Sequence, residues 1–435
     1  MPFEARRMSG RLQLAKGSCY RLEGPASIKM VGGLLKVLGK PIKPKEAFMV
    51  PRSKSIPVEV VEDSTVEVKL GPEASFEPLS SPPIPREWIS AAEGILEAGR
   101  PVKVLVLGDV DSGKALFCAF LVNRLVEAGL KVGILDCDPG QAEVFVPTTI
   151  ALGLAKGLVT GIDEASLLAS YFIGSTSPSG LVDRMLTGVA SLMERALKLG
   201  VEALIVNTSG WVLGRGARAL GWGLLNLVKP SHVVLIQRGV EVEHLVKPYL
   251  HKGGMRVPAS PLVRSRSRED RRVRRELAFR GYFAKAKVRK FSLDTVGLMY
   301  TLFGTGFRMS VERMMEVEKV VGRRVVYGEE APDSLFVVVE EPPPSMEEAA
   351  VALKQRFNKE EVLITYSGAE QGLIVGLMDQ DHNMLGLGLI RELDYRERTI
   401  SILTPVEEAV SLIQVGQLKL SEDCREVARV DGWPL

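Results

Sequence analysis

Cysteine and histidine are both scarce in this chain. Its 435 residues hold only four of each, and the four cysteines, Cys19, Cys118, Cys137 and Cys424, form no CxxC pair. This spacing excludes a disulfide framework and a thiolate zinc site as predictions. The histidines are equally dispersed, so they predict no structural metal site.

Long apolar runs and a strong net charge are also missing. No stretch approaches the roughly 18 uninterrupted apolar residues of a membrane span, and the N-terminal sequence MPFEARRMSG lacks the apolar segment of a secretory signal. We therefore expect a soluble, cytoplasmic protein without membrane contact. The formal net charge is only +3, so attraction to a polyanion must come from a local patch.

The chain is long enough for two or three separate cores. Residues from about 20 to 76 alternate apolar and polar side chains in short runs, with turns expected at Gly-Gly, Gly-Lys-Pro and Glu-Asp-Ser. This pattern predicts a small β-sandwich or barrel. The proline-rich stretch EPLSSPPIPREW that follows predicts a linker, because it is too rich in proline for a core element.

From Pro101 the pattern changes to strand, glycine turn, helix, strand. Buried strands are predicted at VKVLVLG and KVGILDCD around the helical segment GKALFCAFLVNRLVEAG, and at VEALIVNT and HVVLIQ around a helix near 217–227. Near-continuous apolar strands separated by helices indicate a mainly parallel sheet covered on both faces. This core is expected to extend to about residue 290.

A third region follows, with strands predicted at LFVVV (335–339), GLIVGLMDQDHNMLGLGLI and RTISILTP. The glycines of LGLGLI lack the downstream glycine and helix of a dinucleotide fingerprint. We therefore interpret that stretch as a strand, not a cofactor site.

The motif GxxxxGK runs from Gly108 to Lys114, after an apolar strand and before a helix. In that context the loop amides and the helix N-terminus hold phosphate oxygens, and the lysine reaches the β and γ groups. GTP is disfavoured, because NKEE at 358–361 lacks the last residue of the guanine-reading motif Asn-Lys-x-Asp. The expected ATP-binding residues are Gly108, Asp109, Val110, Asp111, Ser112, Gly113, Lys114, Ala115 and Leu116.

Ala115 stands where such loops usually carry a hydroxyl that ligates Mg²⁺. One interpretation is loss of function. The other is that a water fills the vacant coordination position, since Mg²⁺ keeps several waters in proteins.

Asp136 and Asp138 end the next strand, near the carboxyl edge where open α/β sheets bind ligands. On an extended strand both side chains point the same way. One carboxylate can then order the magnesium waters while the other accepts a proton from an attacking hydroxyl. The alternative is a pair of turn-forming aspartates before Pro139-Gly140, but the neighbouring phosphate loop favours the functional interpretation.

Three further segments suggest parts of a site. YFIGSTSPSG (171–180) suits close backbone approach to phosphate or sugar. VNTSGWVLGRG (206–216) places Trp211 in a turn, either as a hydrophobic plug or as a face for stacking a base. VRSRSREDRRVRRELAFRGYF (263–283) is either a solvated charged helix or an anion-facing lid. We favour the lid, because so many arginines with few acids repel one another unless an anion lies among them.

The predicted fold is α/β: a P-loop NTPase core with a mainly parallel sheet, flanked by a β-rich N-terminal domain and a β-rich C-terminal domain. We divide the chain into an N-terminal β-sandwich-like domain, a linker with a lead-in helix, a P-loop domain with an arginine lid, and a C-terminal β-rich domain. Their ranges are 1–80, 81–100, 101–290 and 291–435.

The chain resembles the polynucleotide 5′-hydroxyl kinases, a family that includes archaeal RNA kinases and the Clp-type and Grc-type RNA-processing kinases. The resemblance rests on GDVDSGK, DCDPGQ, GSTSPSG, NTSGW followed by KPSHVV, and RSREDRRVRRELAFRGYF, in the family's order. These motifs cover about 100 to 285, and the β-rich flanks also resemble the family's layout. The departure is Ala115, where the family normally has Ser or Thr.

The resemblance implies transfer of the ATP γ-phosphate to the 5′-hydroxyl of RNA, or of DNA, with Mg²⁺ as cofactor and RNA-processing proteins as partners. It implies that Lys114 holds the phosphates, that Asp138 activates the hydroxyl and that Asp136 lies near the metal. Arg271 and Arg275 match the lid arginines. Nucleic-acid contacts are implied for Gln141, Ser175, Thr176, Thr208, Gly210 and Trp211.

Two other functions stay open at this point. A catalytically weak, ATP-binding scaffold subunit of an RNA-processing complex would fit Ala115 and the large flanking domains. An ATPase of the metal-trafficking or targeting group is disfavoured, because those usually carry an additional lysine early in the loop, where this chain has Asp109 and Val110.

Overall fold

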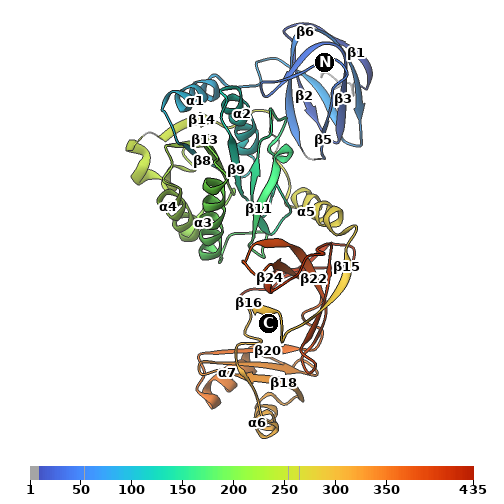
Figure 1. Cartoon of the computed structure of the whole chain (residues 1–435), viewed down its shortest axis with the longest axis vertical. Helices are drawn as coiled ribbons and strands as arrows, with labels where there is room; N and C mark the ends of the chain where they lie inside the picture. Colours follow the sequence, from blue (N-terminus) through green and yellow to red (C-terminus); the bar gives the residue numbers. More distant parts are fainter. Residues whose placement is uncertain (1–8, 53, 253, 264) are drawn as a thin grey trace. The chain divides into compact units, whose positions relative to one another are not determined.

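The computed structural model describes residues 9–52, 54–252, 254–263 and 265–435 (Figure 1). The chain forms two compact units, 1–275 and 276–435, which divide within helix α5 (Arg268–Phe283). Within the described ranges, no helix has both the length and the apolar character needed to cross a membrane.

The first unit begins with an antiparallel β-region. Strand β6 is its centre, because it pairs with β3 over most of its length, with β2 through residues 55–59 and with β1 through residues 64–68. All strands belong to one hydrogen-bonded network with the order β4-β3-β6-β2-β7, in which β1 joins β6 and β5 joins β3. The strands are β1 Gly10–Leu14, β2 Cys19–Glu23, β3 Ala26–Val37, β4 Lys40–Ile42, β5 Ala47–Val50, β6 Ser55–Leu70 and β7 Ser75–Leu79.

Two of the predicted turns in this region are wrong. β3 continues through Gly32-Gly33, and β6 continues through Glu62-Asp63-Ser64. Gly33 has a φ of +87°, and a Cβ there would lie 2.3 Å from the carbonyl oxygen of Asp63. The glycine pair therefore makes a bulge between two long strands instead of a turn.

The proline-rich linker is also shorter than predicted. Glu77, Pro78 and Leu79 belong to β7, which ends the order of the sheet. An edge strand tolerates proline because the missing N–H costs no ladder hydrogen bond there. Six residues separate β7 from helix α1 (Arg86–Glu97).

A seven-stranded central sheet follows, with the order β11-β10-β9-β12-β8-β13-β14. β9, β12, β8, β13 and β14 run parallel, whereas β10 and β11 form an antiparallel hairpin that the sequence analysis did not predict. The strands are β8 Val102–Gly108, β9 Val132–Cys137, β10 Thr149–Leu154, β11 Ser166–Phe172, β12 Ala203–Thr208, β13 His232–Gln237 and β14 Gly254–Pro258. The helices are α2 Lys114–Glu127, α3 Val182–Lys198, α4 Gly214–Val228, η1 Ile162–Glu164, η2 Glu243–Leu245 and η3 Lys247–Lys252.

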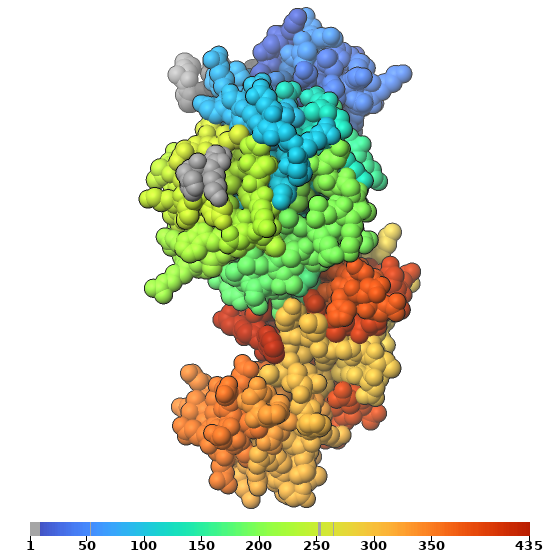
Figure 2. Space-filling view, turned by 60° about the vertical axis from the view of Figure 1, so that its left-hand side comes forward, coloured from blue at the N-terminus to red at the C-terminus, as the bar shows by residue number. Residues whose placement is uncertain are grey.

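Helices cover both faces of this sheet, because successive side chains of its buried strands point to opposite sides. Val104 and Val106 share a core with α2 and the N-terminal β-region. Leu105 and Leu107 share a second core with α3 and α4. Trp88 fixes α1 to the edge of the sheet, since its indole N–H donates to the carbonyl of Pro258 over 2.9 Å. Figure 2 shows α1, in light blue, at the surface beside yellow-green residues of the same unit.

The second unit holds two sheets. The larger has the order β15-β23-β22-β21-β24-β16, with β25 on β24, and the smaller has the order β17-β18-β19-β20. LGLGLI lies in β22, so its interpretation as a strand is confirmed. The strands are β15 Lys287–Ser292, β16 Gly297–Met299, β17 Phe307–Arg308, β18 Val325–Glu330, β19 Ser334–Val339, β20 Glu361–Tyr366, β21 Leu373–Met378, β22 Met384–Asp394, β23 Thr399–Thr404, β24 Leu412–Leu420 and β25 Glu426–Arg429, and the helices are α6 Val311–Val321 and α7 Met346–Phe357.

The prediction of a β-rich α/β fold is confirmed. The division into four domains stays a prediction. The two compact units meet at residues 275 and 276, inside the stretch assigned to the P-loop domain.

Candidate active site

The loop between β8 and α2 has the geometry of a phosphate-binding loop. Lys114 opens α2, and its Nζ donates to the carbonyl oxygens of Gly108 (2.9 Å) and Asp109 (2.8 Å). Burial lowers the pKa of Lys114, and the carboxylate of Asp138 opposes this shift. The Ser112 hydroxyl is buried without a hydrogen-bond partner among the described residues. The loop thus offers an ammonium group and an unpartnered hydroxyl to an anion.

This loop borders a cavity of about 630 Å³ in the first unit. Fourteen of the predicted site residues line it: Val110, Asp111, Ser112, Gly113, Lys114, Ala115, Leu116, Asp138, Gln141, Thr176, Gly210, Trp211, Arg271 and Arg275. Five do not: Gly108, Asp109, Asp136, Ser175 and Thr208.

The two aspartates have different surroundings. Asp136 is 2% exposed, and it accepts hydrogen bonds from the Asn207 amide (3.0 Å) and from the backbone N–H groups of Glu143 (2.7 Å) and Val144 (3.2 Å). Burial raises the pKa of Asp136 to about 7, although the Glu143 hydrogen bond acts against that shift. Asp138 lines the cavity instead.

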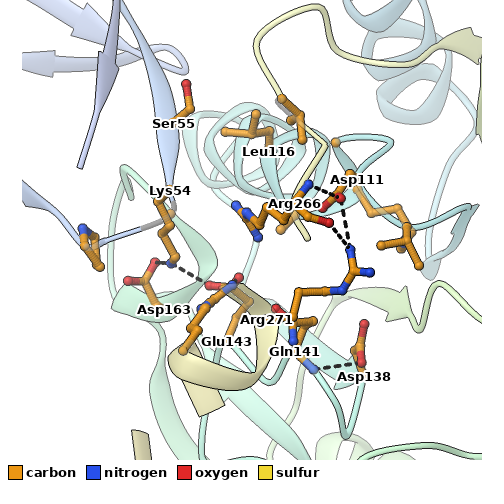
Figure 3. Close-up of a pocket in the computed structure, with 18 of the residues that line it drawn as sticks. Lys54, Ser55, Asp111, Leu116, Asp138, Gln141, Glu143, Asp163, Arg266 and Arg271 are labelled. Atoms are coloured by element: carbon orange, nitrogen blue, oxygen red, sulfur yellow. Dashed lines mark hydrogen bonds and ion pairs between the residues drawn. The ribbon is translucent and has the colours of Figure 1, made fainter. Parts of the chain in front are cut away.

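The turn-forming interpretation of Asp138 is confirmed, whereas its functional role stays a prediction. Its Oδ1 accepts hydrogen bonds from the N–H groups of Gly140 (3.0 Å) and Gln141 (2.9 Å), so it does form a turn. These donors also fix the carboxylate at the wall of the cavity (Figure 3).

The turn after β12 lies against the phosphate-binding loop. A Cβ on Gly210 would lie 2.5 Å from Val110 Cγ2 and 2.8 Å from Val110 N, so only glycine fits this approach. Thr208 donates its hydroxyl to the carbonyl of Val106 (2.8 Å) and so ties β12 to β8. Trp211 is half-buried, packs on the core and lines the cavity, which leaves both of its interpretations open.

The arginines of α5 have counter-charges from distant segments. Arg271 lies 3.2 Å from the Asp111 carboxylate, which also accepts the backbone N–H of Arg266 over 2.9 Å. Arg274 lies 2.6 Å from Glu143. The protein itself therefore supplies counter-charge to Arg271 and Arg274, which the argument for a lid overlooked because it counted only the acids of the arginine run. The lid stays a prediction.

The charged wall residues that the sequence analysis missed include Lys54, Glu143 and Asp163. Lys54, just before β6, lies 2.5 Å from Glu143 and 2.8 Å from Asp163 (Figure 3). Burial alone would raise the pKa of Glu143, but the charges of Arg274 and Lys54 outweigh it and lower the pKa to about 2. The only signal for this cluster was an acid at position 143 between apolar residues, because its partners lie far away in the sequence.

The arrangement suits transfer of a phosphoryl group. Lys114 and the α5 arginines supply positive charge around one cavity, and Asp138 supplies a carboxylate beside them. Positioning and electrostatic stabilisation account for most of the catalysis of such a transfer. The predicted residues converge on that chemistry, although their roles stay predictions.

Comparisons with known proteins agree with this geometry. Residues 108–285 match the family model described as mRNA cleavage and polyadenylation factor CLP1 P-loop. The polyribonucleotide 5′-hydroxyl-kinase of Pyrococcus furiosus is 31% identical over 80% of this chain and 96% of its own length. The enzyme of that name from Methanocaldococcus jannaschii is 28% identical over 80% of this chain and 95% of its own length.

More distant relatives extend the likeness. The polyribonucleotide 5′-hydroxyl-kinase Clp1 of Xenopus tropicalis is 25% identical over 63% of this chain and 67% of its own length. A chain in the solved structure of the wild-type Clp1p–Pcf11p complex matches 95% of this chain and 99% of its own, with 13% identity and a TM-score of 0.63. The chain therefore shares its fold with that structure over the 95% that is matched. By its match to the Pyrococcus furiosus relative over nearly the whole of that protein, the chain belongs to the polyribonucleotide 5′-hydroxyl-kinase family.

Proposed function

We propose that the protein is an ATP-dependent kinase that phosphorylates the 5′-hydroxyl end of RNA. The observation that carries the proposal is the single cavity shared by Lys114, Asp138, Trp211 and Arg271. The names of its archaeal relatives support the same reaction.

The phosphate-binding loop would bind the phosphates of ATP. The loop amides and Lys114 hold the β- and γ-phosphates, with Lys114 exchanging two carbonyl partners for phosphate oxygens. The Ser112 hydroxyl fits this role, because it is buried and unpartnered among the described residues. A triphosphate would supply the partner that the Ser112 hydroxyl lacks among the described residues.

Asp138 would activate the 5′-hydroxyl that attacks the γ-phosphate. The 5′-oxygen of RNA forms a bond to the γ-phosphorus while the bond from that phosphorus to the β-bridging oxygen breaks, so ADP leaves. Asp138 accepts the proton of the attacking hydroxyl. Gln141, Thr176 and Trp211 line the same wall and would hold the RNA end.

The α5 arginines would stabilise the phosphoryl group during its transfer. The ion pair with Asp111 holds Arg271 beside the phosphate-binding loop. A small rearrangement would turn its guanidinium group toward the phosphates. Arg275 also lines the cavity. An arginine that meets the charge of the transition state gives large accelerations in related chemistry.

Mg²⁺ would accompany the nucleotide, but Asp136 does not fit a direct ligand. Both of its oxygens already accept N–H donors, and it does not border the cavity. Within the described ranges, no group of three or more His, Cys, Asp or Glu residues could hold a metal ion. The ion would then be bound by phosphates and water, as Mg²⁺ commonly is.

Radioactive ATP and matched 5′-hydroxyl oligonucleotides test the proposal. We expect label on the RNA, and no label with Lys114→Ala, because the phosphates lose their only loop cation. Label on DNA as well would widen the substrate class. An unlabelled RNA despite measurable ATP binding would overturn the kinase proposal and favour a weak ATP-binding scaffold, the alternative that Ala115 supports.

Ala115→Ser should raise the rate when Mg²⁺ is limiting. The added hydroxyl is a hard oxygen donor in the first turn of α2, next to Lys114. We expect half-maximal labelling at several-fold lower Mg²⁺, measured by titrating the metal at saturating ATP. Ala115→Val adds a side chain without an oxygen and serves as the control. A metal dependence that Ser leaves unchanged would contradict this account of position 115.

A further inference from the structure

Helix α4 carries a basic and aromatic strip. Arg215, Arg218 and Trp222 are spaced three and four residues apart, so they share one side of the helix. Trp222 is 46% exposed. Lys229, directly after the helix, is exposed as well. We call Arg215, Arg218, Trp222 and Lys229 the α4 strip.

The opposite side of α4 packs on the core, so the residues of the strip have no packing role. That side is buried against the core through Ala217, Leu220, Gly221, Leu224, Leu225 and Val228. An exposed tryptophan beside arginines contributes little to that core. The strip therefore suits a ligand better than it suits stability.

The cations of the strip are uncompensated. No Asp or Glu occurs between Glu202 and Glu241 in the sequence. Across the described residues, Arg215, Arg218 and Lys229 form no ion pair. Two carboxylates of the adjacent elements are already engaged: Glu194 of α3 pairs with Lys198 (2.6 Å), and Glu243 of η2 pairs with Arg256 (2.7 Å).

The strip also begins at the wall of the cavity. The ring of Trp211, which lines the cavity, packs on the first turn of α4: a Cβ on Gly216 would lie 2.4 Å from Trp211 Cη2. Arg215 directly precedes Gly216 in the chain. With 1.5 Å of rise per residue, the strip extends about 21 Å from Arg215 to Lys229.

We infer that the α4 strip binds the single strand of RNA downstream of the nucleotides held in the cavity. This inference rests on the proposed function, since it needs the 5′ end to lie beside Trp211. Arginines and a lysine neutralise successive phosphates, and an exposed indole stacks on a base without reading its identity. An acidic protein would need the cations but has no base for Trp222 to stack on.

Substrate length separates the strip from the cavity. We compare Trp222→Ala with wild type on a 5′-hydroxyl dinucleotide and on an RNA of about 20 nucleotides, both at saturating ATP. For the long RNA, KM should rise roughly tenfold with kcat unchanged, because one stacked base is lost. For the dinucleotide, KM should not change. Trp433→Ala is the matched control, since Trp433 is 47% exposed but lies in the second unit.

Salt dependence tests the cations. In Arg215→Ala/Arg218→Ala, the slope of log affinity against log salt for the long RNA should fall by about 1.4, because two phosphate contacts on a single strand are lost. Arg195→Ala/Lys198→Ala removes the same charge from the last turn of α3 and should leave the slope unchanged. Affinity is measured by fluorescence anisotropy, which needs no phosphorylation.

The outcomes distinguish this inference from the proposed function. The role of the strip would be overturned if Trp222→Ala raised KM equally for the dinucleotide and the long RNA. It would also be overturned if the α3 control lowered the salt slope as much as Arg215→Ala/Arg218→Ala does. If the wild type binds long RNA through the strip yet labels no RNA, the kinase proposal fails and the strip stands. Tight binding of an acidic protein, with no strip-dependent binding of RNA, would also overturn it.

Discussion

Asp138→Asn should lower the labelling of 5′-hydroxyl RNA by at least about a hundredfold, because an amide cannot accept the proton of the attacking hydroxyl. The substitution keeps the shape of the side chain. Its carbonyl oxygen can still accept the N–H groups of Gly140 and Gln141, so the turn should persist. ATP binding, measured by equilibrium titration, should change little because the phosphate-binding loop is intact.

Asp163→Asn is the matched control for this result. Asp163 also lines the cavity, but its carboxylate pairs with Lys54 at 2.8 Å and has no proposed part in the proton transfer. We expect it to keep most of the wild-type kcat. Activity of Asp138→Asn within a few-fold of wild type, with normal ATP binding, would remove Asp138 from the proposed mechanism.

The second large effect is on stability. Glu143→Gln should lower the free energy of unfolding by about 3–5 kcal/mol at pH 7, because it leaves Lys54 and Arg274, whose side chains are only 15% and 19% exposed, without their shared counter-charge. For a unit of this size, that corresponds to a fall in Tm of roughly 6–20 °C. Thermal unfolding followed by circular dichroism measures it.

The pH dependence of Glu143→Gln provides an independent check. In the folded protein the pKa of Glu143 is about 2, below the ordinary value of 4.5. The carboxylate therefore stabilises the fold above about pH 4.5, and this contribution is lost as the pH falls toward 2. The gap between wild type and Glu143→Gln should be full at pH 7 and should narrow below pH 4.

Glu73→Gln is the control for the ion pair itself. Glu73 pairs with Arg52 at 2.8 Å, but both side chains are more than half exposed, so the loss should be at most about 1 kcal/mol. Equal destabilisation by the two substitutions would show that burial at Glu143 carries no special weight.

Local patterns predicted the strands and loop that position the site. VKVLVLG and HVVLIQ coincide with β8 and β13, because a near-continuous apolar run bounded by glycine or polar residues has few alternatives to a buried strand. The sequence analysis missed the hairpin β10–β11 because its strands lack such a run. Its strands mix glycine, serine and tyrosine with apolar residues, so neither periodicity nor an apolar run marks them.

The charged wall of the cavity could not be predicted from spacing. Lys54, Glu143 and Arg274 come from an N-terminal loop, the turn after β9 and helix α5, and nothing in their sequence neighbourhoods indicates that they meet. The arginine run shows the same limit. The sequence analysis counted only the acids within the run, whereas Asp111 and Glu143 supply negative charge from 160 and 131 residues away.

The hydrogen bonds of Lys114 also bear on turnover. In the protein alone its ammonium group already has two carbonyl acceptors, and Arg271 already has Asp111. The two carbonyl oxygens and the Asp111 carboxylate compete with phosphate oxygens for Lys114 and Arg271. They therefore lower the affinity for ATP and ADP alike. As ADP leaves, Lys114 and Arg271 would regain these acceptors within the protein, so neither cation would be left unpaired.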